Sequence, residues 1–307
     1  MDHEIGPKGR FKVSTRSALL DKGFYRTPTL YISHAPSLCA FYLSSRKPKI
    51  AKRARDIYVT WHTLEMTENQ IKFGVWHVKE GFAPPSTDIT RIEDFIPSAK
   101  LSLLLTQTSL KPHIQKKNYE RWCEILPEAK ELKFLWLPSK VNQKIFDAVC
   151  RIPNLEGLWI EWSSVKNIDN LVKLSSLRHL HLGASSQVEN IEALASLSNL
   201  ETLATEQLNK ISDFSPIAGL RQLQGLGLDG GMYISQKINT LEPIGGLENL
   251  KYLTLTNSQI KDKSLDPLLK LNELMRLNCS LNYPASEFDK LKSMPNLKYG
   301  NVVSSWK

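Results

Sequence analysis

Leucines recur at a nearly fixed spacing over the second half of the chain. Eight segments of the form L-x-x-L-x-L, or close to it, follow one another in nearly equal steps and begin at residues 132, 155, 177, 200, 223, 250, 274 and 297. Within each segment the apolar positions alternate as in a half-buried strand, and the residues that follow are enough for a turn and a helical return. The pattern predicts a solenoid of class α/β in which each repeat contributes one strand to a curved parallel sheet.

The first frame of this array is less regular. "LSLLLT", beginning at Leu101, is interpreted as a partial frame that precedes the frame at Leu132 by 31 residues. Between them, "KKNYERWCEIL" (116–126) has apolar residues at helical spacing, which predicts a helix. At the far end, "NLKYGNVVSSWK" lacks a complete return segment. We expect it to be a terminal half-repeat, with Trp306 covering the last leucines.

Two β-rich runs precede the repeats. "IYVTWHTLE" and "IKFGVWHVKE" are separated by "MTENQ", which predicts a β-hairpin that "GFAPPSTD" ends. We expect this hairpin to be an N-terminal cap whose tryptophans shield the first repeat; a ligand cradle or metal pair built from its two Trp-His pairs is the alternative. The predicted organisation is a basic, flexible segment (1–56), a hairpin cap (57–100) and a leucine-rich repeat domain (101–307).

The return segments resemble those of the bacterial leucine-rich repeat class typified by internalins. "SPIAGL" (215–220), "EPIGGL" (242–247) and "DPLLKL" (266–271) each precede a strand, and residues 249–271 are the most faithful repeat. The resemblance covers about residues 100–307 and implies recognition of a macromolecule on the concave face of the sheet. The class usually buries an asparagine three positions after the last leucine of the strand, and here only Asn282 matches. Less regular turns are therefore expected where Ser163, Ser185, Leu208, Gly231 and Ser258 stand.

Alternation along the strands predicts which side chains lie on the concave face. Aromatic residues gather on its N-terminal half and polar or acidic residues follow, and a contiguous set of exposed aromatics usually marks a contact surface. "LQGLGLDGG" adds Gly225, Gly227 and Gly230 as a flat patch that a partner backbone could approach. In the alternative, residues 1–56 fold back over the aromatics. The predicted partner-binding residues are Phe134, Trp136, Trp159, Glu161, Trp162, His179, His181, Glu206, Asp229 and Tyr252.

The segment "LRHLHL" places His179 and His181 on the same face, about 7 Å apart along the strand. Two imidazoles at that distance can reach one zinc ion, which needs a third ligand. The equivalent positions on the flanking strands are not usual metal ligands, although Glu161 and Glu206 lie one step further along. We predict an exposed polar pair and no metal or cofactor, with a metal-dependent enzyme as the alternative.

The positive charge is concentrated at the N-terminus. The 307 residues carry a net charge of +9, and residues 1–56 alone hold twelve Lys or Arg against four Asp or Glu. The rest of the chain is close to neutral, so a globally basic nucleic-acid-binding body is not indicated. "RKPKIAKRAR" (46–55) is interpreted as a solvated linker. Binding of nucleic acid or an anionic surface through this segment, with the solenoid as scaffold, is the alternative function.

Motifs that would indicate catalysis are missing from the sequence. It contains no phosphate-binding loop, dinucleotide fingerprint, H-E-x-x-H or G-x-S-x-G, so the chain is predicted not to be an enzyme. Four widely spaced cysteines and a polar N-terminus favour a reducing, cytoplasmic location, and no apolar run is long enough for a membrane span. The predicted function is a module that binds a protein or peptide on the concave face, or more narrowly an immunity or antitoxin-like partner of a toxin. The identity of the partner and the oligomeric state stay open.

Overall fold

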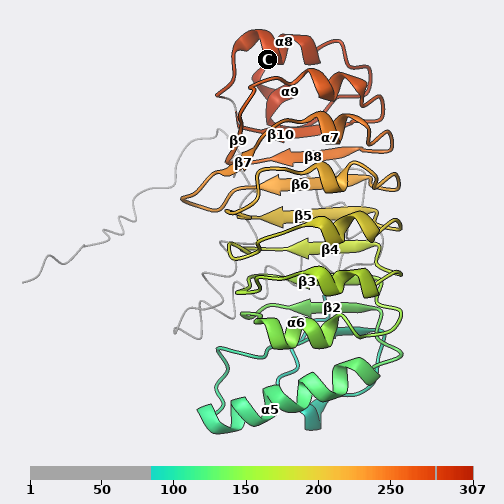
Figure 1. The fold of residues 1–307 in the computed structure, drawn as a ribbon, viewed down its shortest axis with the longest axis vertical. Coiled ribbons are helices and arrows are strands. Elements are labelled where there is room, and N and C mark those ends of the chain that lie inside the picture. The colour runs from blue at the N-terminus through green and yellow to red at the C-terminus, as the bar shows by residue number, and fades with distance from the viewer. Residues whose placement is uncertain (1–83, 281, 307) are drawn as a thin grey trace, which may run out of the picture. The chain divides into compact units, whose positions relative to one another are not determined.

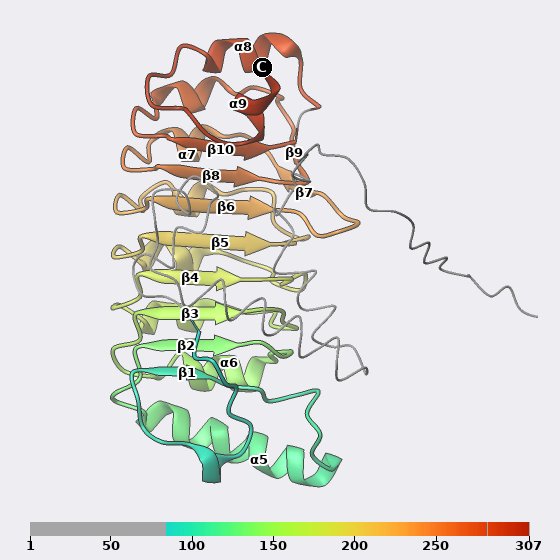
Figure 2. The ribbon, with the colours of Figure 1, turned by 180° about the vertical axis from the view of Figure 1, so that it is seen from behind.

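A computed structural model describes residues 84–280 and 282–306. The strands predicted for the seven frames at 132 to 274 are present and, with a strand in the partial frame at Leu101, form one parallel sheet of eight strands, in the order β1-β2-β3-β4-β5-β6-β8-β10 (Figures 1 and 2). This confirms the predicted solenoid. The frame at Leu297 forms no strand, and its Tyr299 makes only an isolated bridge to Arg276. The strands are β1 (Lys100–Ser102), β2 (Phe134–Leu137), β3 (Gly157–Ile160), β4 (His179–Leu182), β5 (Thr202–Glu206), β6 (Gly225–Asp229), β8 (Tyr252–Leu255) and β10 (Arg276–Cys279).

The strand register keeps equivalent positions of successive repeats in line. Leu135 lies opposite Leu158, which lies opposite Leu180, and the line continues through Leu203 and Leu226. Because side chains alternate along a strand, these leucines all face one side of the sheet. Their neighbours in the sequence face the other side, which we call the outer sheet face.

Helical return segments cover the leucine side of the sheet (Figures 1 and 2). The buried leucines lie between the two layers in one continuous core, and each fully buried side chain contributes about 1.5–3 kcal/mol. The return that follows β2 begins where the Asn142 side chain accepts a hydrogen bond from the backbone N–H of Ile145. The returns are α6 (Gln143–Val149), η4 (Asp169–Lys173), η5 (Glu192–Ser196), η6 (Ser215–Ile217), α7 (Glu242–Gly245), η7 (Asp266–Lys270) and α8 (Ala285–Leu291).

The first repeat differs from the predicted frame. Leu101 pairs with Leu135, the second leucine of the next repeat, and not with Leu132, so the predicted offset between these two frames is wrong. The extra length holds α5 (Pro112–Ile125) and η3 (Leu126–Glu128), which include the predicted helix. Trp122 of α5 is fully buried, and its Nε1–H donates to the carbonyl of Thr90 at 3.2 Å.

Short segments flank the repeats at both ends of the described chain. Residues 84–100 contain η2 (Ile92–Asp94) and part of β1, whereas the predicted hairpin lies outside the described residues. At the C-terminal end, α9 (Asn301–Ser305) precedes Trp306, which packs against the main core as expected. None of the helices among residues 84–280 and 282–306 has the length and apolar character needed to cross a bilayer.

The turns after the strands use serines in place of buried asparagines. The Ser163 and Ser185 hydroxyls lie 2.9 Å apart, and Ser258 donates to the carbonyl of Leu255 at 2.6 Å. Asn282 is exposed, so the one predicted match to the buried asparagine is wrong. One position before the expected buried asparagine, the equivalent residues Ala184, Gln207 and Asn257 have positive φ angles of 35°, 61° and 47°. These turns therefore share a backbone conformation although none of them has the buried asparagine.

The longest repeat after the first one begins at Leu223 and ends before Leu250, and it holds an extra loop and a strand of a second, two-stranded sheet. The strands of that sheet, β7 (Gln236–Ile238) and β9 (Ser258–Ile260), are parallel and lie beyond the ends of β6 and β8. The buried Gln236 side chain bridges to the preceding repeat. Its Oε1 accepts from the N–H of Leu208 at 2.9 Å, and its Nε2 donates to the carbonyl of Ile211 at 2.7 Å.

Candidate interaction surface

The strand register places six predicted site residues in two lines across the outer sheet face. One line runs through Phe134, Gly157, His179, Thr202, Gly225 and Tyr252; the other runs through Trp136, Trp159, His181, Ala204, Gly227 and Thr254. Neighbouring parallel strands lie about 4.8 Å apart, so adjacent members of a line are close neighbours on the face. The sequence alternation therefore correctly placed these six residues on one face of the sheet.

Three aromatic residues form a small cluster at the N-terminal end of this face. Phe134, Trp136 and Trp159 group together, separate from the main core. Their exposed fractions are only 9%, 3% and 6%, and Tyr252 at 5% is buried as well. The prediction that these aromatics are exposed is therefore wrong. Part of the reason lies within the face, because the Trp159 ring stacks on His181 with 3.8 Å between ring centroids.

The two histidines are not an exposed pair. His179 is fully buried, with Nδ1 2.9 Å from the Thr202 hydroxyl, and His181 is half-buried under the Trp159 ring. Burial favours the neutral imidazole, which lowers the pKa of His179 to about 4 and that of His181 to about 3. In the part of the chain that the structure describes, no three His, Cys, Asp or Glu side chains are placed to hold a metal ion together.

Three carboxylates lie at the carboxyl ends of the strands. Glu161 follows β3, Glu206 ends β5 and pairs in register with Asp229, which ends β6; all three are half-buried. The Glu161 Oε2 accepts from Trp159 Nε1 at 3.0 Å, and the Asp229 carboxylate accepts from the Thr254 hydroxyl at 2.8 Å. We call these three residues the acidic row.

Burial and mutual repulsion weaken the ionisation of the acidic row. Burial, together with the smaller effect of the negative charge of Glu206, raises the pKa of Glu161 to about 7 and that of Asp229 to about 6. Hydrogen bonds from Trp159 to Glu161, and from Thr254 and Thr256 to Asp229, act in the opposite direction. No Lys or Arg among the described residues forms an ion pair with Glu161 or Asp229. These two carboxylates are therefore suited to a cationic group supplied by a partner.

Glycines shape the face beside the acidic row. A Cβ added at Gly227 would lie 2.9 Å from the Thr254 hydroxyl, so the glycine leaves room for that side chain. Gly225 and Gly227 are both buried, so the predicted open patch is not exposed at these two glycines. Gly230 is different, because its added Cβ would lie 2.1 Å from the carbonyl oxygen of Asn257. Gly230 packs against the next repeat, and the prediction that it belongs to the open patch is wrong. Trp162 belongs to neither line of the outer sheet face, because it follows β3 in the turn, where its side chain is half-buried.

A ladder of alternating charges at the opposite ends of the strands was missed. Lys133 pairs with Glu156 at 2.7 Å, and Arg178 makes a bidentate contact with Glu201 at 2.7 and 3.0 Å. Glu156 also lies 3.9 Å from Arg178, which links the pairs. The signal is present in the sequence, because the residue after the first leucine of each frame alternates in sign over these four repeats. These charges largely satisfy one another, so this end of the strands offers a partner less uncompensated charge than Glu161 and Asp229 do.

Comparison with known proteins adds a likeness of fold. No protein-family model and no curated protein matches the chain, whereas 149 chains of solved structures do. Internalin C2 of Listeria monocytogenes is 27% identical with a TM-score of 0.40, over 51% of this chain and 64% of that one. Internalin F of the same organism is 19% identical with a TM-score of 0.42, over 57% of this chain and 55% of that one.

A plant protein of the same architecture is also similar. The peptide hormone receptor RGFR1, solved in complex with RGF2, is 15% identical with a TM-score of 0.35, over 50% of this chain and 29% of the receptor. The chain thus spans less than two thirds of each of these three proteins. The leucine-rich repeat fold itself rests on the repeat spacing and the strand register of this chain.

Proposed function

We propose that this chain is a non-enzymatic interaction module that binds a protein or peptide on the outer sheet face. The observation that carries the proposal is the acidic row beside the small residues of β5 and β6. A segment of a partner chain can approach the half-buried Ala204 and Thr254 on this face, and its Lys or Arg side chains can reach the carboxylates. The aromatic cluster next to the row supplies apolar contact area.

The raised pKa values give this proposal a pH signature. A cation bound at the acidic row favours the ionised carboxylates, so binding at neutral pH is accompanied by release of protons from Glu161 and Asp229. Affinity should therefore increase as the pH rises from about 5 to about 8. A partner that contacts only the aromatics would show no such dependence.

Trp159 is not simply an exposed contact residue. Trp159 is buried and holds Glu161 through its indole N–H, so it positions the row as well as offering ring area. Trp136 lies opposite Trp159 in register, and the half-buried Trp162 flanks Glu161. We propose these three as anchors for an apolar part of the partner.

Affinity capture from native cell extract tests the proposal. The full chain is compared with Glu161→Gln/Asp229→Asn and with Trp159→Ala/Trp162→Ala, at moderate salt and with nuclease. Glu192→Gln/Glu273→Gln, which removes two exposed carboxylates elsewhere, is the matched control. A protein retained by the parent and the control, and lost from the first variant, supports the proposal; a captured toxin would establish the narrower immunity interpretation.

Two results would move the site. Equal capture by the parent and both site variants would exclude the outer sheet face. Binding that falls steeply with salt and disappears when residues 1–56 are deleted, yet survives the site substitutions, would favour the basic N-terminal segment. Salt-insensitive binding that survives this deletion would remove that alternative.

A further inference from the structure

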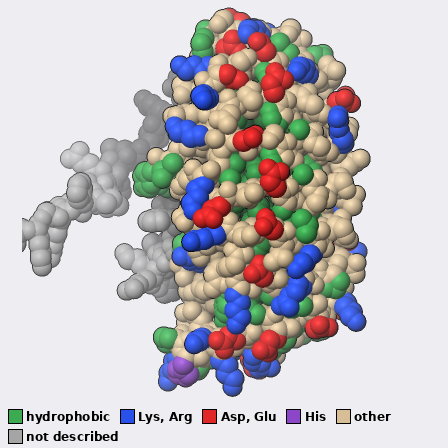
Figure 3. Space-filling view, viewed as in Figure 1, with side chains coloured by type: hydrophobic (Ala, Val, Ile, Leu, Met, Phe, Trp, Pro, Cys, Tyr) green, Lys and Arg blue, Asp and Glu red, His purple; other side chains and the backbone are tan. Residues whose placement is uncertain are grey.

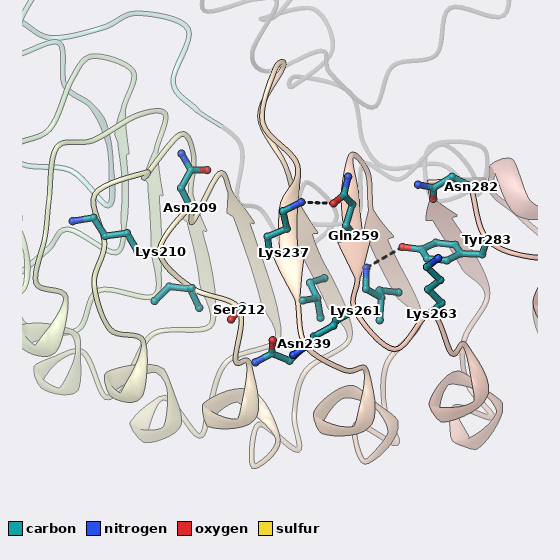
Figure 4. A pocket seen from close by; sticks show the side chains of 13 residues that line it. Asn209, Lys210, Ser212, Lys237, Asn239, Gln259, Lys261, Lys263, Asn282 and Tyr283 are labelled. Atoms are coloured by element: carbon teal, nitrogen blue, oxygen red, sulfur yellow. Dashed lines mark hydrogen bonds between the residues drawn. The ribbon is translucent and has the colours of Figure 1, made fainter.

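A second candidate surface lies on the flank of the repeats, beside the two-stranded sheet β7–β9. A groove of about 620 Å³ runs across four successive repeats there (Figure 4). Four of its lining residues are lysines, Lys210, Lys237, Lys261 and Lys263, and none is acidic. Lys and Arg side chains are also gathered along this flank in the space-filling view, on the left of Figure 3. The groove is therefore a local concentration of positive charge on a body that is otherwise close to neutral.

The lysines are available to a ligand to different degrees. Lys210 pairs with Glu189 at 2.8 Å, and the Lys237 ammonium donates to the Gln259 side chain (Figure 4). Lys261 and Lys263 are exposed and take part in none of the ion pairs formed by the described residues. These two ammonium groups are therefore available to an anionic group that enters the groove.

Amide side chains supply the rest of the polar lining. Asn209, Asn239, Gln259 and Asn282 are exposed at the groove and come from four repeats. Each amide offers both donors and an acceptor, which is what the N–H and C=O groups of an extended backbone require. Buried isoleucines from β7 and β9 lie between them and give the groove a firm base.

We propose that this groove binds an extended acidic segment of a protein, with carboxylates on Lys261 and Lys263 and backbone groups on the amides. A flat bilayer cannot enter the recess, and the polar lining lacks the apolar face that interfacial segments insert into a membrane. Single-stranded nucleic acid would need aromatic platforms for its bases. The one aromatic residue that lines the groove, Tyr283, is 9% exposed, and its hydroxyl accepts from the N–H of Ile260 at 3.3 Å.

Fluorescence anisotropy on the full chain tests this assignment. The probe is a labelled peptide of alternating Glu and Ser, compared with a peptide of alternating Gln and Ser, with oligothymidylate and with phosphatidylserine vesicles. We expect the acidic peptide to bind at least about tenfold more tightly than the uncharged one at low salt. Lys261→Glu/Lys263→Glu should weaken it about tenfold, because two attractions become repulsions. Asn239→Ala/Asn282→Ala should weaken it about threefold with an unchanged salt slope.

Matched variants separate this site from other charges. Lys116→Glu/Lys117→Glu makes the same charge change on two exposed lysines of α5 and should leave the affinity within about twofold. Glu161→Gln/Asp229→Asn should also leave it unchanged, so failure here is distinguishable from failure of the outer-face proposal. A photo-crosslinking peptide should label residues around β7 and β9.

Three outcomes would overturn the assignment. The first is an affinity that Lys261→Glu/Lys263→Glu does not change while the melting temperature is retained. The second is crosslinking confined to residues 1–56. The third is tighter binding of oligothymidylate or vesicles than of the acidic peptide through the same two lysines. Lys261→Gln/Lys263→Gln provides the same test without charge reversal if the glutamate variant fails to fold.

Discussion

The two halves of the main sheet share their inward side chains and differ in their outward ones. Strands β2–β4 carry Trp136, Trp159 and His181 along one line of the outer face, and β5, β6 and β8 continue that line with Ala204, Gly227 and Thr254. On the inward side, leucines occupy equivalent positions in both halves. The repeat thus fixes the core, while the outward positions are free to differ from one strand to the next.

This difference assigns separate tasks to the two halves. Large rings at β2 and β3 pack on one another and on His181, so that end of the face is apolar and dense. Small residues stand at β5 and β6 beside the acidic row. The partner segment that we propose would meet apolar area at one end of the face and carboxylates at the other.

The largest expected effect concerns the shared core. Leu158→Ala in β3 and Leu226→Ala in β6 should each lower the free energy of unfolding by about 3 kcal/mol, because both leucines are buried and each change leaves a cavity. Urea unfolding of the two variants beside the parent chain measures this. A loss at one site that exceeds the loss at the other by more than about 2 kcal/mol, the spread among buried leucines in general, would mean that the core differs between the halves.

A smaller loss is expected from a glycine at the boundary between the halves. Gly183 follows β4, and a Cβ there would lie 2.3 Å from the Glu161 carbonyl oxygen, so Gly183→Ala must shift the backbone. We expect Gly183→Ala to destabilise the chain by about 2 kcal/mol. Gly219→Ala is the matched control because its Cβ would meet no atom within 4 Å, and it should be neutral or slightly stabilising. Equal melting temperatures for the two variants would contradict this expectation.

The smallest expected effect is a pair of opposite pH dependences. The pKa of Glu161 is raised in the folded chain to about 7, so its carboxyl costs stability increasingly as the pH rises from about 4.5 to 7. The pKa of His181 is lowered to about 3, so this residue costs stability increasingly as the pH falls below about 6.5. Each effect should be about 1–2 kcal/mol, because both side chains keep some contact with solvent.

Substitution separates the two pH effects. Glu161→Gln should flatten the stability profile between about pH 4.5 and 7, and His181→Asn should flatten it between about pH 6.5 and 4, as measured by urea unfolding at each pH. Glu192→Gln, which changes an exposed carboxyl on a return segment, should leave the stability profile unchanged in both pH ranges. A profile that Glu161→Gln does not alter would show that its carboxyl ionises normally in the folded chain.

The fold could be predicted because the spacing of buried leucines is a local property of the sequence. An alternating leucine segment that returns after nearly constant intervals suffices to place a strand, and equal spacing aligns the strands. The prediction for the first repeat is wrong because "LSLLLT" offers several leucines that could begin the frame. Only the pairing of β1 with β2 shows that Leu101 lies opposite Leu135, and this pairing depends on the tertiary structure.

The candidate site could be predicted only in part. Alternation identified the outward residues, and register alone would have brought Trp159 beside His181. Burial of Phe134, Trp136 and Tyr252 could not be read from the same pattern, because exposure depends on what packs from outside the strand. The lysine groove was missed for a related reason, since its lysines lie outside the strand motif and come together only through the stacking of successive repeats.

The buried Gln236 side chain has a consequence for how such an array could have grown. It hydrogen-bonds both the N–H and the carbonyl of Leu208 in the preceding repeat, whereas Ser163 and Ser185 meet through like hydroxyls. A gene duplication that inserted a copy of a serine-bearing repeat next to another would reproduce the same contact. A repeat inserted between those of Leu208 and Gln236 would have to present its own backbone N–H and carbonyl to this buried amide in the same geometry. An insertion at this point is therefore limited by the shape of the turn, whereas an insertion between serine-bearing repeats needs only another hydroxyl.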